Sequence, residues 1–196
     1  MVDMKTRGYT MGVRQEAKDA TRDAILTAAI DTFMAERSFA ITLPAVAERA
    51  AVTVKTVLRH FGSRDALIDA AWSRAYDEVM AERTPPTPEA EAALGVLIAH
   101  YERRGDMVLA VLSEKNDDPR AERMNNTGRL AHRAWVEEVF DSRLPEEPAA
   151  RSRLVDVLVV ATDVYSWKLL RLDRGLSVDD VLDRMLLMTG ALLEAL

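Results

Sequence analysis

Apolar residues recur at helical spacing through almost the whole chain, and this periodicity limits the possible folds more than any other feature. Ile25, Ala29 and Phe33, for example, lie four residues apart, as on one face of a helix. No long stretch alternates apolar and polar residues as a half-buried strand would, and the 196 residues include only eight glycines. The sequence therefore predicts an all-α fold.

Composition excludes several classes of protein. The chain has no cysteine, which excludes a disulfide framework, thiolate metal sites and a cysteine nucleophile. Its apolar runs fall far short of the ~18 residues that a membrane span needs. The first residues lack the apolar core of a secretory signal, so we expect a cytoplasmic protein with no membrane partner. The three histidines lack metal-site spacing and no phosphate-binding motif occurs, so we expect no metal, cofactor or catalytic residue, and no enzyme.

Charge is distributed unevenly along the chain. Residues 1–62 carry nine Lys and Arg and seven Asp and Glu, a net charge of +2, whereas the whole chain has −6. This asymmetry favours two roles on one chain. Pro85, Pro86 and Pro88 mark a boundary between helices, and Gly105 with its polar neighbours at 103–106 predicts a second break.

Residues 42–61 predict two short helices joined by a tight turn. Thr42 and Thr53 are suitable N-caps, and Ser63 is suited to cap the helix that follows. In the second short helix, the inward-facing side chains are expected to be Val54, Val57, Leu58 and Phe61, and the outward-facing ones Lys55, Thr56, Arg59 and His60. A helix-turn-helix presents such a donor-rich face to the DNA major groove. A small bundle with a solvated cationic face is the alternative.

The region from Thr21 to Ile68 resembles the DNA-binding domain of the TetR (tetracycline repressor) family of transcriptional regulators. The matching residues are Arg22 with Ile25-Leu26, Ala28-Ala29 and Phe33, then Thr42 with Val46-Ala47 and Ala50 to Thr53, then Thr56 to Phe61, then Ser63 to Leu67. The resemblance implies a helix-turn-helix domain over 21–66 and a larger ligand-binding and dimerisation domain over 67–196. It further implies a homodimer that binds a palindromic double-stranded DNA operator, acts as a repressor and responds to a small-molecule effector. The DNA-binding residues implied are Thr42, Thr53, Lys55, Thr56, Arg59, His60 and Arg64.

Four residues depart from the family pattern. Ser38 and Ala51 stand where the family usually has Gly, and we expect Ala51 to adopt an ordinary helical or bridge conformation. Leu58 replaces a Tyr whose hydroxyl touches a phosphate, so one phosphate contact is expected to be lost. Arg64 replaces a common Lys and keeps the charge.

The C-terminal part predicts two unusually apolar helices, one from Leu154 to Leu172 and one after Ser177. A helix that is apolar on nearly every side needs more than one buried face, which favours a partner surface, although two central core helices are the alternative. The candidate dimer-interface residues are Leu158, Leu182, Met185, Leu186, Thr189 and Leu193. The candidate effector-pocket residues are Trp72, Tyr76, Tyr101, Met107, Trp135 and Tyr165.

Two other functions fit the same pattern. One is a helical protein-interaction adaptor that has lost DNA binding, suggested by Ala51 and Leu58. The other is a small all-α enzyme. Residues 1–20 are predicted to be a mostly disordered arm, with minor-groove contact as the alternative. A DNA binder that uses Lys18, Lys55, Arg59 and Arg64 in each head must lose affinity as salt rises.

Overall fold

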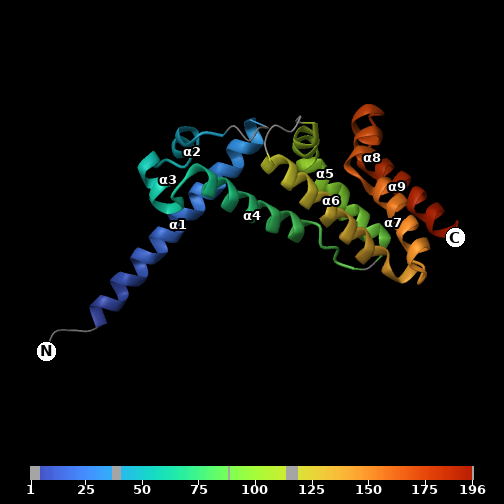
Figure 1. The fold of residues 1–196 in the computed structure, drawn as a ribbon, viewed down its shortest axis with the longest axis horizontal. Helices are drawn as coiled ribbons and strands as arrows, with labels where there is room; N and C mark the ends of the chain where they lie inside the picture. The colour runs from blue at the N-terminus through green and yellow to red at the C-terminus, as the bar shows by residue number, and fades with distance from the viewer. Residues whose placement is uncertain (1–4, 37–40, 88, 114–118, 196) are drawn as a thin grey trace. The chain divides into compact units, whose positions relative to one another are not determined.

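The computed structural model describes residues 5–36, 41–87, 89–113 and 119–195. These residues form helices and no strand, so the predicted all-α fold is confirmed (Figure 1). The chain divides into two compact units, residues 1–78 and 79–196. The division lies inside a helix, α4. No helix among the described residues is long and apolar enough to cross a membrane.

The first unit holds α1 (Lys5–Glu36), α2 (Leu43–Arg49), α3 (Val54–Phe61) and most of α4 (Arg64–Glu82). Its core is built from the apolar residues that recur at helical spacing, including Ile25, Ala29, Val46, Val57 and Leu67. The three predicted N-caps are confirmed. The hydroxyls of Thr42, Thr53 and Ser63 accept hydrogen bonds from the backbone N–H groups of residues 45, 56 and 66.

Helix α1 begins much earlier than the sequence predicts. Residues 5–20 are helical rather than disordered, and residues 1–4 of the predicted arm lie outside the described part of the chain. Side chains within this segment support the helix, because Gln15 donates to the Asp19 carboxylate at 2.9 Å and Thr21 donates to the Ala17 carbonyl at 2.8 Å. Glu, Gln, Lys and Ala are also strong helix formers.

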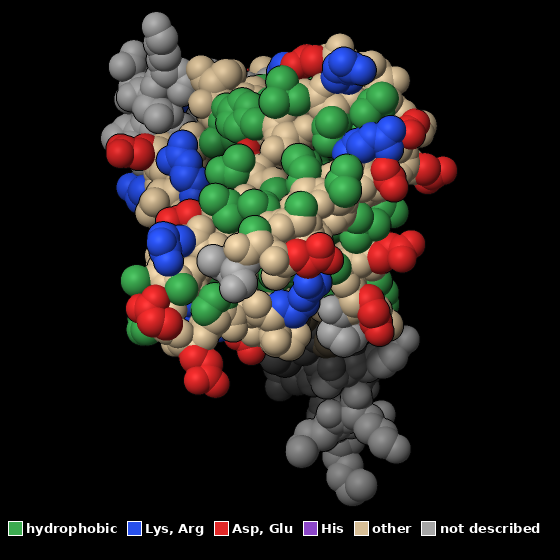
Figure 2. Space-filling view, turned by 90° about the vertical axis from the view of Figure 1, so that its right-hand side faces the viewer, with side chains coloured by type: hydrophobic (Ala, Val, Ile, Leu, Met, Phe, Trp, Pro, Cys, Tyr) green, Lys and Arg blue, Asp and Glu red, His purple; other side chains and the backbone are tan. Residues whose placement is uncertain are grey.

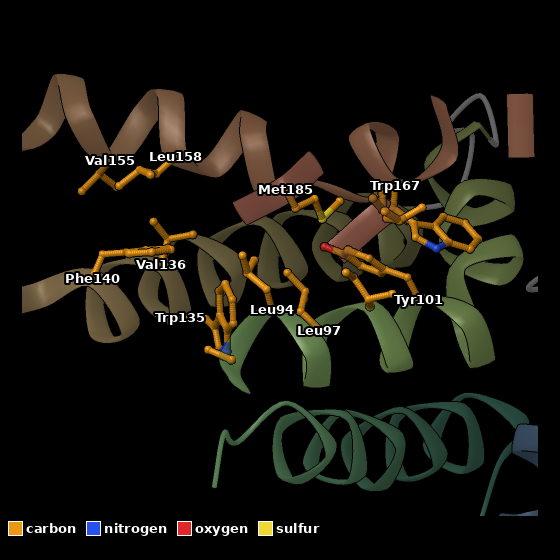
Figure 3. Close-up of a cluster of buried hydrophobic side chains, with 14 of the residues drawn as sticks. Leu94, Leu97, Tyr101, Trp135, Val136, Phe140, Val155, Leu158, Trp167 and Met185 are labelled. Carbon is orange, nitrogen blue, oxygen red and sulfur yellow. The ribbon is translucent and has the colours of Figure 1, made fainter. Parts of the chain in front are cut away.

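The second unit contains the end of α4 and the remaining helices. These are α5 (Ala90–Ser113), α6 (Pro119–Phe140), a 3₁₀ turn η1 (Asp141–Arg143), α7 (Pro148–Thr162), α8 (Val164–Lys168), a π-helical turn η2 (Leu169–Asp173) and α9 (Val178–Glu194). α5 packs against α6, α8 and α9, while α7 packs against α6 and α9. Figure 3 shows the resulting core, with Leu94, Phe140, Leu158, Trp167 and Met185 among its members. The boundary around residues 84–88 is confirmed, although Pro88 itself is outside the described residues.

The predicted break at 103–106 is wrong. α5 continues through these residues, and Gly105 lies against the indole of Trp167. A Cβ atom at position 105 would come within 2.5 Å of the Trp167 ring. The glycine therefore allows α5 and α8 to approach closely. In the sequence, a glycine with this role cannot be distinguished from one that marks a turn.

The single helix predicted from Leu154 to Leu172 is also wrong. α7 ends at Thr162, and Asp163 takes an extended conformation with φ −70° and ψ 155°. The Asp163 carboxylate then accepts a hydrogen bond from the Tyr165 N–H at 2.9 Å and caps α8. Capping by an Asp side chain competes with continuation of the helix. The break could not be recognised in the sequence because the apolar pattern continues on both sides of Asp163.

Candidate DNA-binding surface

Helices α2 and α3 form the predicted helix-turn-helix, and Ala51 occupies its corner. The N–H of Ala51 donates to the Glu48 carbonyl at 3.1 Å and the N–H of Val52 donates to the Ala47 carbonyl at 2.9 Å. This pair of bonds is the Schellman motif, which requires a left-handed residue after the helix. Ala51 has a φ of +53°, so the expectation of an ordinary helical or bridge conformation is wrong. The capping bonds hold Ala51 in a conformation that costs a non-glycine residue about 1–2 kcal/mol.

Helix α3 has a buried side and an exposed side, with one change from the predicted pattern. Val57 is fully buried, and Val54 and Phe61 are half-buried against the core of the first unit. Leu58, predicted to face inward, is 38% exposed. It lies one residue beyond Val57, about 100° round the helix, and so falls at the edge of the buried stripe.

The predicted DNA-binding residues differ in whether their side chains already make contacts within the protein. Lys55 and Arg59 are exposed on α3. The hydroxyls of Thr53 and Thr56 lie 3.0 Å apart and are engaged in the N-cap, and the Thr42 hydroxyl caps α2. Arg64 donates from Nε to the Ile41 carbonyl at 2.7 Å, so part of its guanidinium supports the fold.

Cations from α1 extend the positive surface of α3. The pKa of His60 is lowered from its ordinary value by partial burial and by the charges of Arg59, Lys18 and Arg22. The Arg22 guanidinium lies 4.5 Å from the centre of the Phe61 ring, in a cation–π contact between α1 and α3. Arg22 is absent from the predicted site, since its position beside α3 depends on how α1 packs.

Comparison with known proteins agrees with this geometry. Residues 25–71 match the family described as bacterial regulatory proteins, tetR family. The matched segment spans α2 and α3, so this helix-turn-helix is of the kind found in tetR-family regulatory proteins. The sequence matches no curated protein.

Solved structures of TetR-family and other regulators share the fold. A tetR-family transcriptional regulator from Streptomyces coelicolor has a TM-score of 0.67 and 16% identity over 90% of this chain and 88% of that one. A transcriptional regulator from Rhodococcus sp. Rha1 has a TM-score of 0.63 and 15% identity over 89% and 96%. A TetR transcription regulator from Haloarcula marismortui has a TM-score of 0.53 and 15% identity over 91% and 98%.

The second unit does not gather the six pocket candidates. Tyr101 and Trp135 are buried in its core, where the Tyr101 hydroxyl donates to the Thr162 carbonyl and the Trp135 indole donates to the Arg83 carbonyl, both at 3.0 Å. Met107 is half-buried on α5, and Tyr165 is 49% exposed. Trp72 and Tyr76 are half-buried on the part of α4 that belongs to the first unit.

A group of charged and polar side chains surrounds the end of α4 in the second unit. Glu82 accepts two hydrogen bonds from Arg104, at 2.8 and 3.1 Å, and these bonds are the main cause that lowers its pKa to about 2. Arg83 Nη2 lies 2.7 Å from Nδ1 of His132, and Nε2 of His132 lies 3.1 Å from the Thr162 hydroxyl. Burial, followed by the charge of Arg83, lowers the pKa of His132 to about 3. The sequence does not indicate that these residues come together, because they are far apart in the chain.

The six dimer-interface candidates differ in how far their side chains are exposed. Leu158, Met185 and Thr189 are buried inside the chain's own core, so their side chains are not available to a partner. Leu182, Leu186 and Leu193 are half-buried against that core. The exposed apolar residues on the same helices and the adjoining turn are Val157, Val160, Tyr165, Leu169, Leu172 and Leu187. Figure 2 shows hydrophobic side chains gathered across the middle of this face, with charged side chains around its margin.

Proposed function

We propose that this protein is a TetR-family repressor that binds a palindromic DNA operator as a homodimer and responds to a small-molecule effector. The observation that carries the proposal is the surface of α3. Lys55 and Arg59 project from a short helix whose start is capped by Thr53 and whose opposite side is anchored by Val57. Arg and Lys on such a helix bond to guanine edges or to phosphates in the major groove.

The exposed apolar face of α7 and α9 supports a homodimer. Val160 and Leu187 are each 67% exposed, and Val157 is 42% exposed. Soluble proteins rarely leave a contiguous apolar surface uncovered, and a self-complementary contact about a two-fold axis buries the same face of both copies. Two DNA-binding units related by such an axis match the two half-sites of a palindrome.

The effector response is proposed to act through the second unit. Tyr101 and Trp135 are the interior aromatic residues of this unit that the sequence predicts as pocket residues, and both contact groups next to the end of α4. An effector that displaces either side chain also disturbs the Arg83 and Thr162 contacts. Such coupling is reciprocal, so DNA must weaken effector binding by the factor by which the effector weakens DNA binding.

Selection from randomised double-stranded DNA on the purified protein tests the proposal. The expected result is a palindrome with half-sites about one turn apart, bound with an affinity that falls steeply as salt rises. Arg59→Ala should weaken binding to the recovered duplex at least tenfold while the helical circular dichroism stays unchanged. If no motif is recovered and binding is insensitive to salt, the regulator proposal fails and a protein-interaction adaptor becomes the better explanation.

A further inference from the structure

The N-terminal part of α1 carries its charges on separate sides. Arg14, Lys18 and Arg22 are spaced by four residues and fall within an arc of ~80° around the helix. The acidic residues Glu16 and Asp19 lie on the other side, about 200° and 140° from Arg14, respectively. We call Arg14, Lys18 and Arg22 the cationic stripe of α1.

The cationic stripe is continuous with the DNA-facing side of α3. Arg22, at its C-terminal end, is stacked on Phe61 of α3. Lys18, one turn earlier, is near enough to act on the charge of His60, together with Arg59. Arg14 is a further turn along the same side. The stripe therefore begins beside the recognition helix and leads away from it along α1.

Nothing in the described part of the first unit covers this segment. Residues 12–20 are all exposed, including Val13 at 49%. A helix that is polar nearly all round gains little free energy from packing within its own domain. Binding to a partner outside the domain therefore explains this helical segment better than packing does. Apolar exposure within these residues is scattered, whereas the cations are aligned, and this favours an anionic partner over an apolar one.

We propose that the cationic stripe of α1 binds the DNA phosphate backbone beside the base pairs that α3 contacts. The inference rests on the proposed function, because it takes the α3 surface as the DNA-reading surface. Arg14 and Lys18 would each neutralise a phosphate in the flank of the half-site, which adds affinity without adding base recognition. The partner is duplex DNA longer than the recognised motif.

The experiment uses the duplex recovered by wild-type selection, prepared in two lengths. One ends at the motif, and the other continues for about one turn on each side. Two variants are compared with wild type. Arg14→Ala/Lys18→Ala removes two cations. Glu16→Lys/Lys18→Glu keeps the net charge but moves one cation about 160° round the helix. Circular dichroism and thermal melting establish that each variant is folded.

On the longer duplex, the double-alanine variant should lower the slope of log affinity against log salt by about 0.9 per lost contact, or about 1.8 per bound head. The charge-relocated variant should lose affinity in the same direction. On the short duplex, both variants should bind as wild type does. This combination supports a contact made in the flank.

Two results would overturn the proposal. Equal slopes for wild type and the double-alanine variant on the longer duplex would show that the stripe makes no phosphate contact. Unchanged affinity in the charge-relocated variant would show that only the net charge attracts DNA. Arg59→Ala separates failure of the flank contact from failure of the proposed function. If Arg59→Ala weakens DNA binding while the stripe variants do not, only the flank contact fails. If Arg59→Ala binds DNA as wild type does, the proposed function fails.

Discussion

The backbone of Gly105 in α5 and the indole of Trp167 in α8 fit together only because position 105 has no side chain. A Cβ there would stand 2.5 Å from the ring, well inside van der Waals contact. The Trp167 indole N–H also donates to Glu102 at 2.8 Å, one turn before Gly105, so the ring is held from two directions. A substitution at Gly105 must displace a buried aromatic ring rather than a flexible chain end.

Gly105→Ala is accordingly expected to destabilise the protein by about 1–3 kcal/mol, because overpacking outweighs the gain in helix propensity. Urea denaturation followed by circular dichroism measures the free energy of unfolding. Gly95→Ala is the matched control, since a methyl group added at Gly95 in the same helix would meet nothing within 4 Å, and it should stabilise by about 0.5–1 kcal/mol. Stabilisation by both substitutions would contradict the close contact.

Ala51→Gly is expected to stabilise the first unit by about 0.5–1 kcal/mol, because Gly adopts the left-handed conformation without steric penalty. The control is Ala50→Gly, because Ala50 has φ −79° and the substitution there should destabilise by a similar amount. Thermal melting of the two variants beside wild type gives the comparison. A lower melting temperature for Ala51→Gly would mean that the corner is not left-handed.

Val160→Glu is expected to dissociate the proposed homodimer, because it places a charge within the exposed apolar face of α7 and α9. The monomer should remain folded, since Val160 is largely exposed within one chain. Leu130→Glu provides the control on α6, where the replaced side chain is 60% exposed. Light scattering in the absence of DNA measures the mass. A Val160→Glu protein that keeps the dimer mass would exclude this face.

Acidification from pH 7 to pH 5 is expected to destabilise the protein through its buried histidines. Burial lowers the pKa of His132 to about 3 and that of His100 to about 4, whereas the unfolded chain binds protons near 6.5. The unfolded state then takes up more protons, so stability falls as pH drops through 6.5, by about 2 kcal/mol per histidine over this interval. Glu82, with a pKa of about 2, stays ionised throughout.

His132→Gln should remove about half of this pH dependence, because Gln cannot take up a proton in either state. Glutamine also retains an acceptor for the Arg83 guanidinium. Urea denaturation at pH 7, 6 and 5 gives the slope for wild type and variant. Parallel slopes for the two proteins would show that His132 is not the neutral, buried group described above.

Features that depend on near neighbours in the sequence could be predicted, whereas features that depend on packing could not. The N-caps at Thr42, Thr53 and Ser63 require only a hydroxyl before a helical pattern, and all three are present. The exposure of Leu58 could not be predicted, because the boundary between the buried and exposed sides depends on how closely α3 packs against its neighbours. The role of Gly105 could not be predicted either, because a glycine that lets an aromatic ring pack against the backbone looks the same in a sequence as a glycine that ends a helix.

The same distinction between local and packing-dependent features applies to the exposed apolar face of α7 and α9 and to the cations of α1. Both C-terminal helices are apolar on nearly every side, so periodicity alone does not say which side faces the core. Met185 and Leu187 are only two residues apart, yet the first is fully buried and the second is 67% exposed. Arg22 joins the α3 surface through a contact with Phe61, 39 positions later, which no local pattern indicates.

The hydroxyls of Thr53 and Thr56 at the start of α3 are predicted DNA contacts that also take part in the N-cap, and this limits how the specificity for DNA can change. Thr53 fixes the start of the helix, and Thr56 shares its hydroxyl contact, so replacing either alters the shape of the reading element as well as its chemistry. Lys55 and Arg59 stand clear of the cap. Substitutions that change the preferred DNA sequence should therefore accumulate at positions 55 and 59, and substitutions at positions 53 and 56 should be rarer.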